Sequence, residues 1–425
     1  MNNQFQTISM IGLGYIGLPT AAMFASRRVR VIGVDVNRHA VDTINRGEIH
    51  IVEPELDMIV SAAVNQGFLR ATTTPEPADA FLIAVPTPFE ADHQPDLSYV
   101  HAAADAIAPV LRKGNLVILE STSPVGTTEE MARRLAAARP DLSFPQDAGE
   151  SADVNVAYCP ERVLPGKVVH ELVANARVIG GMTPRCSQRA ASLYKIFVQA
   201  ECIPTNARTA EMCKLTENSY RDVNIAFANE LSIICDKLGI SVWELISLAN
   251  RHPRVGILQP GPGVGGHCIA VDPWFIVSKT PEEARLIRMA REVNDGKPRW
   301  VLDKVKVAIT DFLQAHPEKS ARDVTIACFG LTFKPDIDDL RESPALEIAS
   351  HLSCLHPGAV WAVEPYVKQL PPAHDRISLK AAPDALRGAD VLVLLVDHKE
   401  FLSIPRESFA GKVVVDTRNI SRASL

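Results

Sequence analysis

The residues with the clearest chemical potential surround one cysteine in a glycine- and proline-rich segment. Residues 260–268 read PGPGVGGHC, and Asp272-Pro273 follows shortly afterwards. A core cysteine packs like a small hydrophobe and needs no such loop, whereas glycines let the backbone approach a ligand closely. The segment therefore predicts that Cys268 is presented to a substrate as a nucleophile. The alternative is a structural thiol packed beneath a glycine-rich turn.

A second glycine motif predicts a dinucleotide site near the start of the chain. Gly12, Gly14 and Gly17 fit G-x-G-x-x-G between an apolar stretch and a helical pattern, and Asp35 ends the next expected strand. This context places a pyrophosphate at a helix N-terminus and a carboxylate on the ribose hydroxyls. An acidic residue there disfavours a 2′-phosphate, so we expect NAD rather than NADP. A glycine turn that binds no dinucleotide is the alternative.

A dinucleotide site combined with a presented thiol indicates a particular reaction. An alcohol carbon can give one hydride to NAD, but the resulting aldehyde has no good hydride to give until a nucleophile adds to it. A thiolate makes a thiohemiacetal, which gives a second hydride and leaves a thioester for water to cleave. The sequence therefore predicts a four-electron oxidation of a primary alcohol.

Candidate helpers lie on the elements expected around this chemistry. Lys214 and Asn218 are four residues apart and share a helix face, Asp272 follows the cysteine, and Glu161 follows an apolar strand. A solvated helix face, a turn carboxylate and a surface-loop glutamate are the alternatives. Thr87 and Thr122 follow two strands at the ligand-binding edge of the sheet, and we expect them near the nicotinamide unless they only cap helices.

Basic residues in the second half suit a phosphate or diphosphate. They lie in residues 250–254 (NRHPR) and in the segment that joins a strand to a helix near Lys334 and Arg341, where Phe333 could stack on a base. Ion pairing with the neighbouring Asp336, Asp338 and Asp339 is the alternative.

The expected elements give an α/β fold with two Rossmann-like doubly wound domains joined by a long central helix. Strands are expected at 7–11, 29–35, 80–85, 116–120, 154–158, 177–179, 324–329, 360–363, 391–396 and 413–415. A helical region covers 207–249, with Gly239 ending one helix and Ser241 capping the next. A helix at 283–313 should kink or split at Pro298, and another should begin at Ser343-Pro344.

Composition limits the function classes. The 425 residues are 47% hydrophobic and 22% charged, with a formal net charge of −6, so a nucleic acid or anionic membrane is an unexpected partner. The eight cysteines show no zinc-like spacing, which predicts no metal site. We expect no signal peptide and no membrane span, hence a cytoplasmic protein with reduced thiols.

The motifs, taken together and in order, resemble the UDP-glucose/GDP-mannose dehydrogenase family over the whole chain. They are the 12–17 glycines, 121–126 (STSPVG), Pro160-Glu161, 211–218 (EMCKLTEN), Gly265 to Cys268 with Asp272-Pro273, and 333–344 (FKPDIDDLRESP). The resemblance implies an NAD domain at 1–206, a central helical dimerisation domain with the cysteine loop at 207–315, and a UDP-sugar domain at 316–425. A homodimer or higher homo-oligomer follows from it.

The resemblance also implies residue roles. Cys268 is the nucleophile, Lys214 an acid/base or oxyanion group, and Asn218 and Asp272 assist, while Thr122 and Glu161 position the water. The implied NAD contacts are Gly12, Gly14, Tyr15, Ile16, Gly17, Asp35, Thr87, Thr122 and Arg341. The implied UDP-sugar contacts are Arg162, Val163, Lys214, Asn218, Arg221, Arg251, Gly263, Phe333 and Lys334.

One departure bears on the hydrolytic step. Many UDP-glucose members carry a second acidic residue four positions after the one at Glu161, where this chain has Pro165, so the general base stays open. The resemblance favours UDP-N-acetyl-D-mannosamine as substrate and a surface-polysaccharide precursor, of the enterobacterial common antigen type, as product. UDP-glucose, UDP-GlcNAc and UDP-GalNAc remain alternatives, as do a two-electron hydroxyacid dehydrogenase and a non-catalytic sensor.

Overall fold

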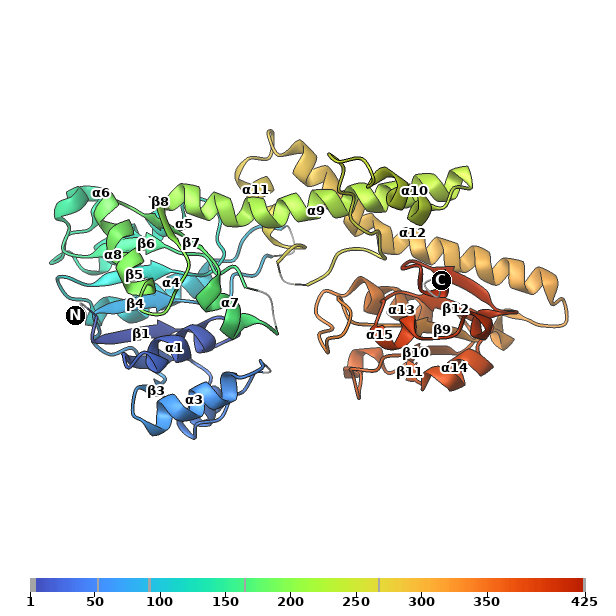
Figure 1. The fold of residues 1–425 in the computed structure, drawn as a ribbon, viewed down its shortest axis with the longest axis horizontal. Coiled ribbons are helices and arrows are strands. Elements are labelled where there is room, and N and C mark those ends of the chain that lie inside the picture. Colours follow the sequence, from blue (N-terminus) through green and yellow to red (C-terminus); the bar gives the residue numbers. More distant parts are fainter. Residues whose placement is uncertain (1–4, 52, 91–92, 164–165, 267, 423–425) are drawn as a thin grey trace. The chain divides into compact units, whose positions relative to one another are not determined.

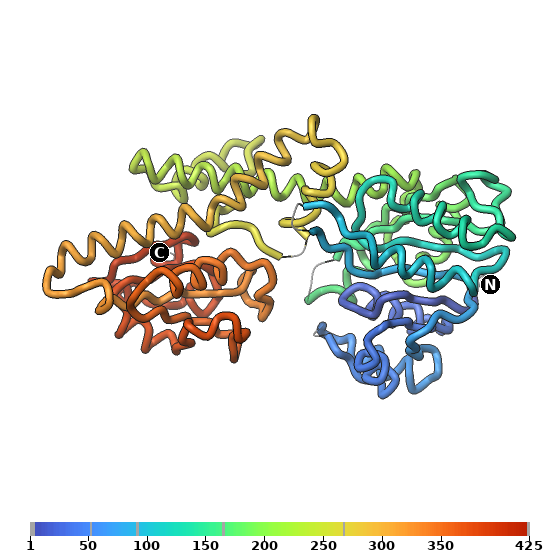
Figure 2. The backbone as a smooth tube through the Cα atoms, turned by 180° about the vertical axis from the view of Figure 1, so that it is seen from behind, coloured from blue at the N-terminus to red at the C-terminus, as the bar shows by residue number. Residues whose placement is uncertain are grey.

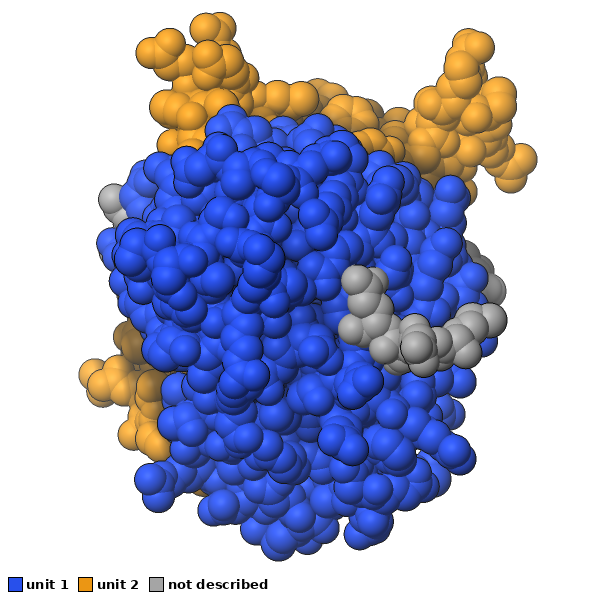
Figure 3. Space-filling view, turned by 90° about the vertical axis from the view of Figure 1, so that its left-hand side faces the viewer, with its two compact units in different colours: residues 1–217 blue, residues 218–425 orange. Residues whose placement is uncertain are grey.

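The computed structural model describes residues 5–51, 53–90, 93–163, 166–266 and 268–422. The chain divides into two compact units, Met1–Glu217 and Asn218–Leu425 (Figure 3). The boundary falls inside helix α9 (Ala207–Leu238), a single long helix (Figure 1). Among the described residues, no helix has both the length and the apolar composition that crossing a bilayer requires.

Unit 1 is built on an eight-stranded sheet with the order β3-β2-β1-β4-β5-β6-β7-β8. Every neighbouring pair is parallel except β6 and β7, which are antiparallel. The strands are β1 (Thr7–Ile11), β2 (Arg30–Val34), β3 (Leu69–Thr72), β4 (Ala80–Ile83), β5 (Leu116–Leu119), β6 (Asn155–Tyr158), β7 (Arg177–Gly181) and β8 (Cys202–Asn206).

Helices cover both faces of this sheet because its strands are apolar on both sides. Ile8 and Met10 of β1 pack into one buried cluster and Ile11 into the other. The first cluster includes side chains of α1, α3, α7 and α8, and the second those of α4 and α5. The helices are α1 (Gly17–Ser26), α2 (Arg38–Asn45), α3 (Leu56–Asn65), α4 (Ser98–Ile107), α5 (Thr127–Ala138), α6 (Pro145–Ala148), α7 (Val168–Ala174) and α8 (Pro184–Tyr194).

Unit 2 combines central helices with a second, five-stranded parallel sheet of the order β11-β10-β9-β12-β13. Its strands are β9 (Ile326–Phe329), β10 (Val360–Val363), β11 (Ser378–Leu379), β12 (Val391–Leu394) and β13 (Val413–Asp416). Beyond α9 its helices are α10 (Val242–Ala249), α11 (Asp272–Lys279), α12 (Arg285–Ala315), α13 (Pro344–Leu355), α14 (Ala382–Gly388) and α15 (Lys399–Leu402).

The first five strands of the eight-stranded sheet and the five strands of the second sheet share the order 3-2-1-4-5. In each, a carboxylate after the second strand accepts a backbone N–H from the first turn. Leu13 N donates to Asp35 Oδ2 at 2.9 Å in unit 1, and Leu331 N donates to Glu364 Oε2 at 2.7 Å in unit 2. The predicted fold of two doubly wound sheets with a long central helix is confirmed.

A buried polar network joins the central helices of unit 2, where α12 crosses α9 (Figure 2). Arg291 Nη1 donates to Asp222 Oδ1 at 2.6 Å, and Asn294 Nδ2 donates to the same oxygen at 2.8 Å. Asn229 bonds Asn294 at 2.9 Å and also accepts from Gly261 N at 2.8 Å. The network therefore ties the start of the cysteine-containing segment to both helices.

Most predicted elements are present, with some differences. Gly239 adopts φ +67° after α9, Ser241 caps α10 and Ser343 caps α13, as predicted. The helix expected at 283–313 runs unbroken through Pro298 as α12, so the predicted split is wrong. Strands β3, β8 and β11 were not predicted, and neither were helices α2, α3, α6, α7, α8, α11, α14 and α15. Two of these strands have a weak strand pattern in the sequence, because β3 exposes Arg70 and β8, at the sheet edge, contains Pro204.

Candidate active site

The glycine turn between β1 and α1 has the close packing that a dinucleotide motif requires. Gly12 has φ +91°, and a Cβ there would lie 2.4 Å from Ala84 O. A Cβ on Gly17 would lie 1.8 Å from Gly12 O, so only glycine lets helix α1 approach the turn. Gly14, Tyr15 and Ile16 lie in the same turn, and Tyr15 is 45% exposed. These residues fit a pyrophosphate at the start of α1.

Asp35 lies directly after β2 and faces this turn. Besides Leu13 N, its carboxylate accepts Asn37 N at Oδ1, at 2.8 Å. Each carboxylate oxygen has more than one acceptor position, so both backbone bonds leave capacity for ribose hydroxyls. The geometry fits the nucleotide contact that the motif predicts.

The ends of β4 and β5 are joined by hydroxyl groups. Thr87 Oγ1 donates to Thr122 O at 2.6 Å. Ser121 Oγ accepts Val85 N at 2.9 Å and donates to Val85 O at 2.7 Å. The structure therefore brings Thr87 and Thr122 together at the carboxyl end of the sheet. Thr87 bonds the neighbouring loop rather than capping a helix.

Glu211 anchors the first turn of α9 in a way that was not predicted. Its carboxylate accepts Gly126 N at 2.6 Å, Thr128 N at 2.8 Å and Thr128 Oγ1 at 2.6 Å. These are the first backbone N–H groups of α5, where a negative charge is favoured. Burial raises the pKa of Glu211, against these bonds, which lower it. Glu211 fixes the helix that carries Lys214.

Lys214 and Glu161 lie together in unit 1. Lys214 Nζ donates to the main-chain oxygen of Glu161 at 2.9 Å. The Glu161 side chain is buried, accepting Arg162 N at 2.7 Å and Arg177 Nη2 at 2.8 Å. The surface-loop alternative for Glu161 is therefore wrong, because its carboxylate is held inside the protein.

The residues that follow Glu161 are only partly described. Arg162 pairs with Glu217 of α9, with Nη2 2.6 Å from Oε1, and Val163 packs against the buried cluster around α1. Pro165 lies outside the described residues.

In unit 2, Cys268 lies at the turn that becomes α11. Its side chain is exposed, and its main-chain oxygen accepts Asp272 N at 2.9 Å. Exposure disfavours the alternative of a structural thiol packed under a glycine turn. Five other thiols are buried, those of Cys159, Cys186, Cys202, Cys235 and Cys328. Burial raises the pKa of Cys159 and of Cys328 to about 12, so these thiols are not nucleophiles.

Asn218 and Asp272 form a buried pair beside this turn. Asn218 Nδ2 donates to Asp272 Oδ2 at 2.5 Å, and Asp272 is 3% exposed. The pair links α9 to the first residue of α11. The alternatives of a solvated helix face and a plain turn carboxylate are wrong for these two residues.

The glycines before Cys268 allow its loop to pack against residues 333–344. A Cβ on Gly265 would lie 2.2 Å from Glu342 O, and one on Gly266, at φ +83°, would lie 2.8 Å from Phe333 Cε2. A Cβ on Gly263 would likewise lie 2.9 Å from Pro344 Cβ. The structure thus brings the cysteine loop and Phe333 together. His267 lies outside the described residues.

Residues 330–344 are held by two buried side chains that were not predicted. His398 Nδ1 accepts Asp336 N at 3.0 Å, and its Nε2 lies 3.1 Å from Glu364 Oε2. Asp336 and Glu342 have positive φ, at +62° and +49°. Non-glycine residues at positive φ cost energy and cluster at functional sites. Glu364 could have been found from the sequence, because it is a carboxylate directly after the expected strand that became β10.

The predicted basic residues of unit 2 differ in their contacts. Arg341 pairs with Asp339, with Nη2 2.6 Å from Oδ2, so the ion-pair alternative holds for this side chain. Lys334, Arg221 and Arg251 are exposed. Their positions leave them available for a phosphate but do not by themselves define a site.

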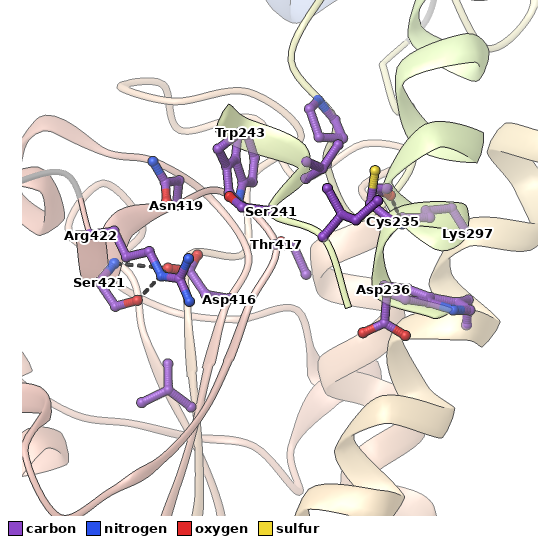
Figure 4. Close-up of a pocket in the computed structure, with 17 residues that line it drawn as sticks. Cys235, Asp236, Ser241, Trp243, Lys297, Asp416, Thr417, Asn419, Ser421 and Arg422 are labelled. Carbon is purple, nitrogen blue, oxygen red and sulfur yellow. Dashed lines mark hydrogen bonds between the residues drawn. The ribbon is translucent and has the colours of Figure 1, made fainter. Parts of the chain in front are cut away.

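A cavity of about 410 Å³ in unit 2 lies away from the predicted residues (Figure 4). Trp243, Asp416 and Arg422 line it, together with the buried Lys297 of α12. Burial lowers the pKa of Lys297 to about 7. None of the predicted catalytic side chains lines this cavity.

Family models match almost the whole chain. The NAD binding domain of the UDP-glucose/GDP-mannose dehydrogenase family matches residues 6–198, its central domain 208–296, and its UDP binding domain 327–423. These matches follow the order of the elements described above.

Relatives of named activity are similar over nearly the full length. UDP-N-acetyl-D-mannosamine dehydrogenases from Salmonella typhi and Escherichia coli K12 are 69% and 67% identical, covering 98% of this chain and 100% of theirs. An NDP-N-acetyl-D-galactosaminuronic acid dehydrogenase from Ralstonia nicotianae is 64% identical, covering 98% and 96%. The solved UDP-D-ManNAc dehydrogenase of Pyrococcus horikoshii is 39% identical, with TM-score 0.86, covering 97% and 96%.

Proposed function

Because the chain belongs to the UDP-glucose/GDP-mannose dehydrogenase family, we propose that it oxidises the C6 alcohol of UDP-N-acetyl-D-mannosamine to the carboxylate. The cofactor is NAD. Several relatives at 67–69% identity carry the corresponding name. The observation that supports this chemistry is the exposed Cys268 at the end of a glycine loop. Its main-chain oxygen accepts Asp272 N, and Asp272 in turn forms a buried pair with Asn218.

The proposed reaction consumes one alcohol, two NAD⁺ and one water, and yields one carboxylate, two NADH and three protons. When bound, NAD accepts a hydride from C6 in each of two steps. Between them, Cys268 sulfur adds to the aldehyde carbon and forms a thiohemiacetal. The second oxidation leaves a thioester on Cys268, and water attacks its carbonyl carbon while the C–S bond breaks.

The remaining residues have proposed roles that follow from their contacts. Lys214 is an ammonium fixed by Glu161 O, suited to stabilising an oxyanion at C6. Asp272 holds Asn218 so that its amide side chain has one orientation. Glu161 and Thr122 orient the water of the hydrolytic step. Arg341 joins the NAD contacts in this proposal, although its observed partner is Asp339.

The domain roles follow the same scheme. We assign NAD binding to residues 1–206, the central helices with the cysteine loop to 207–315 and UDP-sugar binding to 316–425. The proposed UDP-sugar contacts include Phe333, which the cysteine loop touches. The acid product would be a cytoplasmic precursor for surface polysaccharide, of the enterobacterial common antigen type.

A homodimer through the central helices is part of the proposal. Large apolar side chains are exposed along α9, with Phe227 at 52%, Ile234 at 44% and Leu238 at 65%. A row of this kind on a helix is typical of a protein interface. Sedimentation velocity of wild type and Phe227→Asp tests this point, with loss of the dimer expected for the variant.

A panel of UDP-sugars with purified protein and NAD tests the substrate. We expect two NADH for each UDP-N-acetyl-D-mannosamine consumed and weaker turnover with UDP-glucose and UDP-GlcNAc. The same reaction on UDP-N-acetyl-D-galactosamine is the second candidate, because the Ralstonia relative is nearly as similar as the mannosamine enzymes. Turnover restricted to another sugar, or one NADH per sugar, would overturn the assignment.

A further inference from the structure

A buried arginine lies directly behind Glu161. Arg177 is the first residue of β7, its side chain is 4% exposed, and its Nη2 donates to Glu161 Oε2 at 2.8 Å. The guanidinium carbon lies 4.7 Å from the Tyr194 ring centre and 5.5 Å from that of Phe197. These cation–π contacts fix the guanidinium in place. Arg177 therefore connects the sheet to the Glu161 carboxylate through a rigid contact.

The Glu161 carboxylate has one orientation as a result. Arg162 N binds Oε1 and Arg177 binds Oε2. Its main-chain oxygen meanwhile accepts Lys214 Nζ. The same residue thus receives a side-chain contact from β7 and a main-chain contact from α9. Arg177 is the only one of these partners that acts on the carboxylate through its own side chain.

The other ionisable groups buried near Arg177 favour its pairing with Glu161. The second carboxyl, Glu120, follows β5 and accepts Tyr194 OH at 2.5 Å. Burial raises the pKa of Glu120 to about 7, so near neutral pH it retains a proton in a large fraction of molecules. The nearby Cys159 thiol stays neutral as well. Glu161 is then the main counter-charge of Arg177.

We propose that Arg177 is a positioning residue for hydrolysis of the thioester. It holds the Glu161 carboxyl group in the orientation in which it accepts a hydrogen bond from the attacking water. In this step the water oxygen bonds the thioester carbon and the C–S bond breaks. One water proton ends on the Cys268 sulfur, and the other leaves as the product acid ionises to solvent. The inference rests on the proposed function and concerns only the last of its chemical steps.

Stopped-flow NADH absorbance with intact-protein mass spectrometry tests this role in the full-length protein. We expect Arg177→Lys to keep a fast phase approaching two NADH per site, because the hydride steps do not involve Arg177. The following steady-state phase should slow at least tenfold, with a sugar-acyl adduct accumulating on the protein. A lysine retains the charge but not the planar geometry of the guanidinium.

A purely structural role would give a different pattern. Misfolding lowers the amplitude of the fast phase in proportion to the active fraction and leaves the steady-state rate per active site unchanged. That pattern, or an unchanged steady-state rate at full amplitude, would overturn the inference. Arg189→Lys is the matched control, since Arg189 also packs on a ring in unit 1, that of Phe5, and bonds Gly114 O. We expect no adduct to accumulate in it.

A double-mutant comparison protects the test against loss of folding. Arg177→Met alone leaves a buried carboxylate without its partner, whereas Arg177→Met/Glu161→Gln removes both charges. If Arg177 acts through Glu161, the double variant hydrolyses the thioester no more slowly than Glu161→Gln. Independent slowing in the double variant would contradict the inference. Absence of any adduct and of two NADH per sugar in wild type would instead refute the proposed function.

Discussion

Cys268 differs from the other cysteines in where it lies as well as in its loop. Among the described cysteines only Cys354 is also exposed, and it lies on α13 rather than in the glycine segment. Exposure alone therefore does not define the nucleophile. The combination of exposure, a glycine loop and the Asn218–Asp272 pair is what supports the proposed role of Cys268.

Replacing the cysteine sulfur with oxygen should stop the second oxidation. We expect Cys268→Ser to form carboxylate at least about a thousandfold more slowly, because a serine hydroxyl adds poorly to the aldehyde. Cys354→Ser is the matched control and should keep wild-type turnover. Product analysis by liquid chromatography checks both, and carboxylate formed at the wild-type rate by Cys268→Ser would refute the role of the thiol.

Glu120 should make stability depend on pH. Its folded-state pKa, raised by burial to about 7, lies above the unfolded value. Its protonated form therefore stabilises the fold fully below the unfolded pKa, and this contribution is lost as pH rises through about 7. We expect a loss on the order of 2 kcal/mol between pH 5 and 8 from this group. Glu120→Gln should flatten the slope in denaturant unfolding.

An exposed carboxyl provides the control for that experiment. Glu76 pairs with Arg70 at the surface, and Glu76→Gln should leave the slope between pH 5 and 8 as in wild type. An unchanged slope in Glu120→Gln would show that Glu120 is ionised throughout this range.

The sequence predicted the proposed reactive residues but not the residues that support them. Cys268, Lys214 and Asp35 stand in motifs whose residue types and spacing suit the proposed chemistry, so the sequence alone makes them candidates. Arg177 and Glu211 were missed because each acts on a partner far away in sequence, Glu161 and the start of α5. Such partners are set by the fold rather than by local spacing. The mixed run around Arg341 was ambiguous for the same reason.

At the scale of elements, the cysteine loop depends on glycines that touch residues 333–344. A side chain at Gly266 would collide with the Phe333 ring. The residue would also have to keep the left-handed backbone conformation that Gly266 has, with φ +83°. We expect Gly266→Ala to raise the KM for the UDP-sugar about tenfold, equivalent to about 1.4 kcal/mol, with the KM for NAD unchanged. Steady-state kinetics measures both constants.

The matched control for this substitution is another glycine of unit 2. A Cβ on Gly296 meets nothing within 4 Å outside its own helix backbone, so Gly296→Ala should retain both KM values. Equal KM values for the UDP-sugar in Gly266→Ala and wild type would show that contact between the loop and Phe333 does not affect the substrate site.

The network between α9 and α12 should contribute strongly to stability. Asp222→Ala removes the buried partner of Arg291 and leaves it only the half-exposed Asp295. Breaking a buried pair by removing one partner costs up to about 3–5 kcal/mol. We expect a clear fall in the denaturant midpoint. Asp303→Ala, which removes a surface pair with Lys306, should cost under about 1 kcal/mol. Equal effects of the two substitutions would contradict the proposed importance of the network.

Elements with strong signals were predicted and weak ones were not. Continuous apolar runs such as Val391–Leu394 identify central strands, and Gly239 and Ser241 mark a helix end and a cap. The short β11 and the edge strand β8 lack such runs. Pro298 does not split α12, because tertiary packing along the helix offsets the missing hydrogen bond.

At the scale of the whole molecule, the NAD binding and UDP binding domain matches each cover a sheet, and the first five strands of the two sheets have the same order. Both place a carboxylate after the second strand against the first turn. The sequence predicted both sheets from alternating strand and helix patterns. It did not predict the buried contacts of Glu364 and His398, because these depend on how the second sheet folds.

The central claim is that the Cys268 sulfur captures the aldehyde formed by the first oxidation and holds it through the second. Rapid quenching of wild type with UDP-N-acetyl-D-mannosamine and NAD, followed by peptide mass spectrometry, tests it most directly. We predict an acyl adduct on the peptide that contains Cys268, formed as the second NADH appears and lost as the carboxylate is released. Formation of carboxylate and two NADH with no adduct at Cys268, or with the adduct on another residue, would contradict the account.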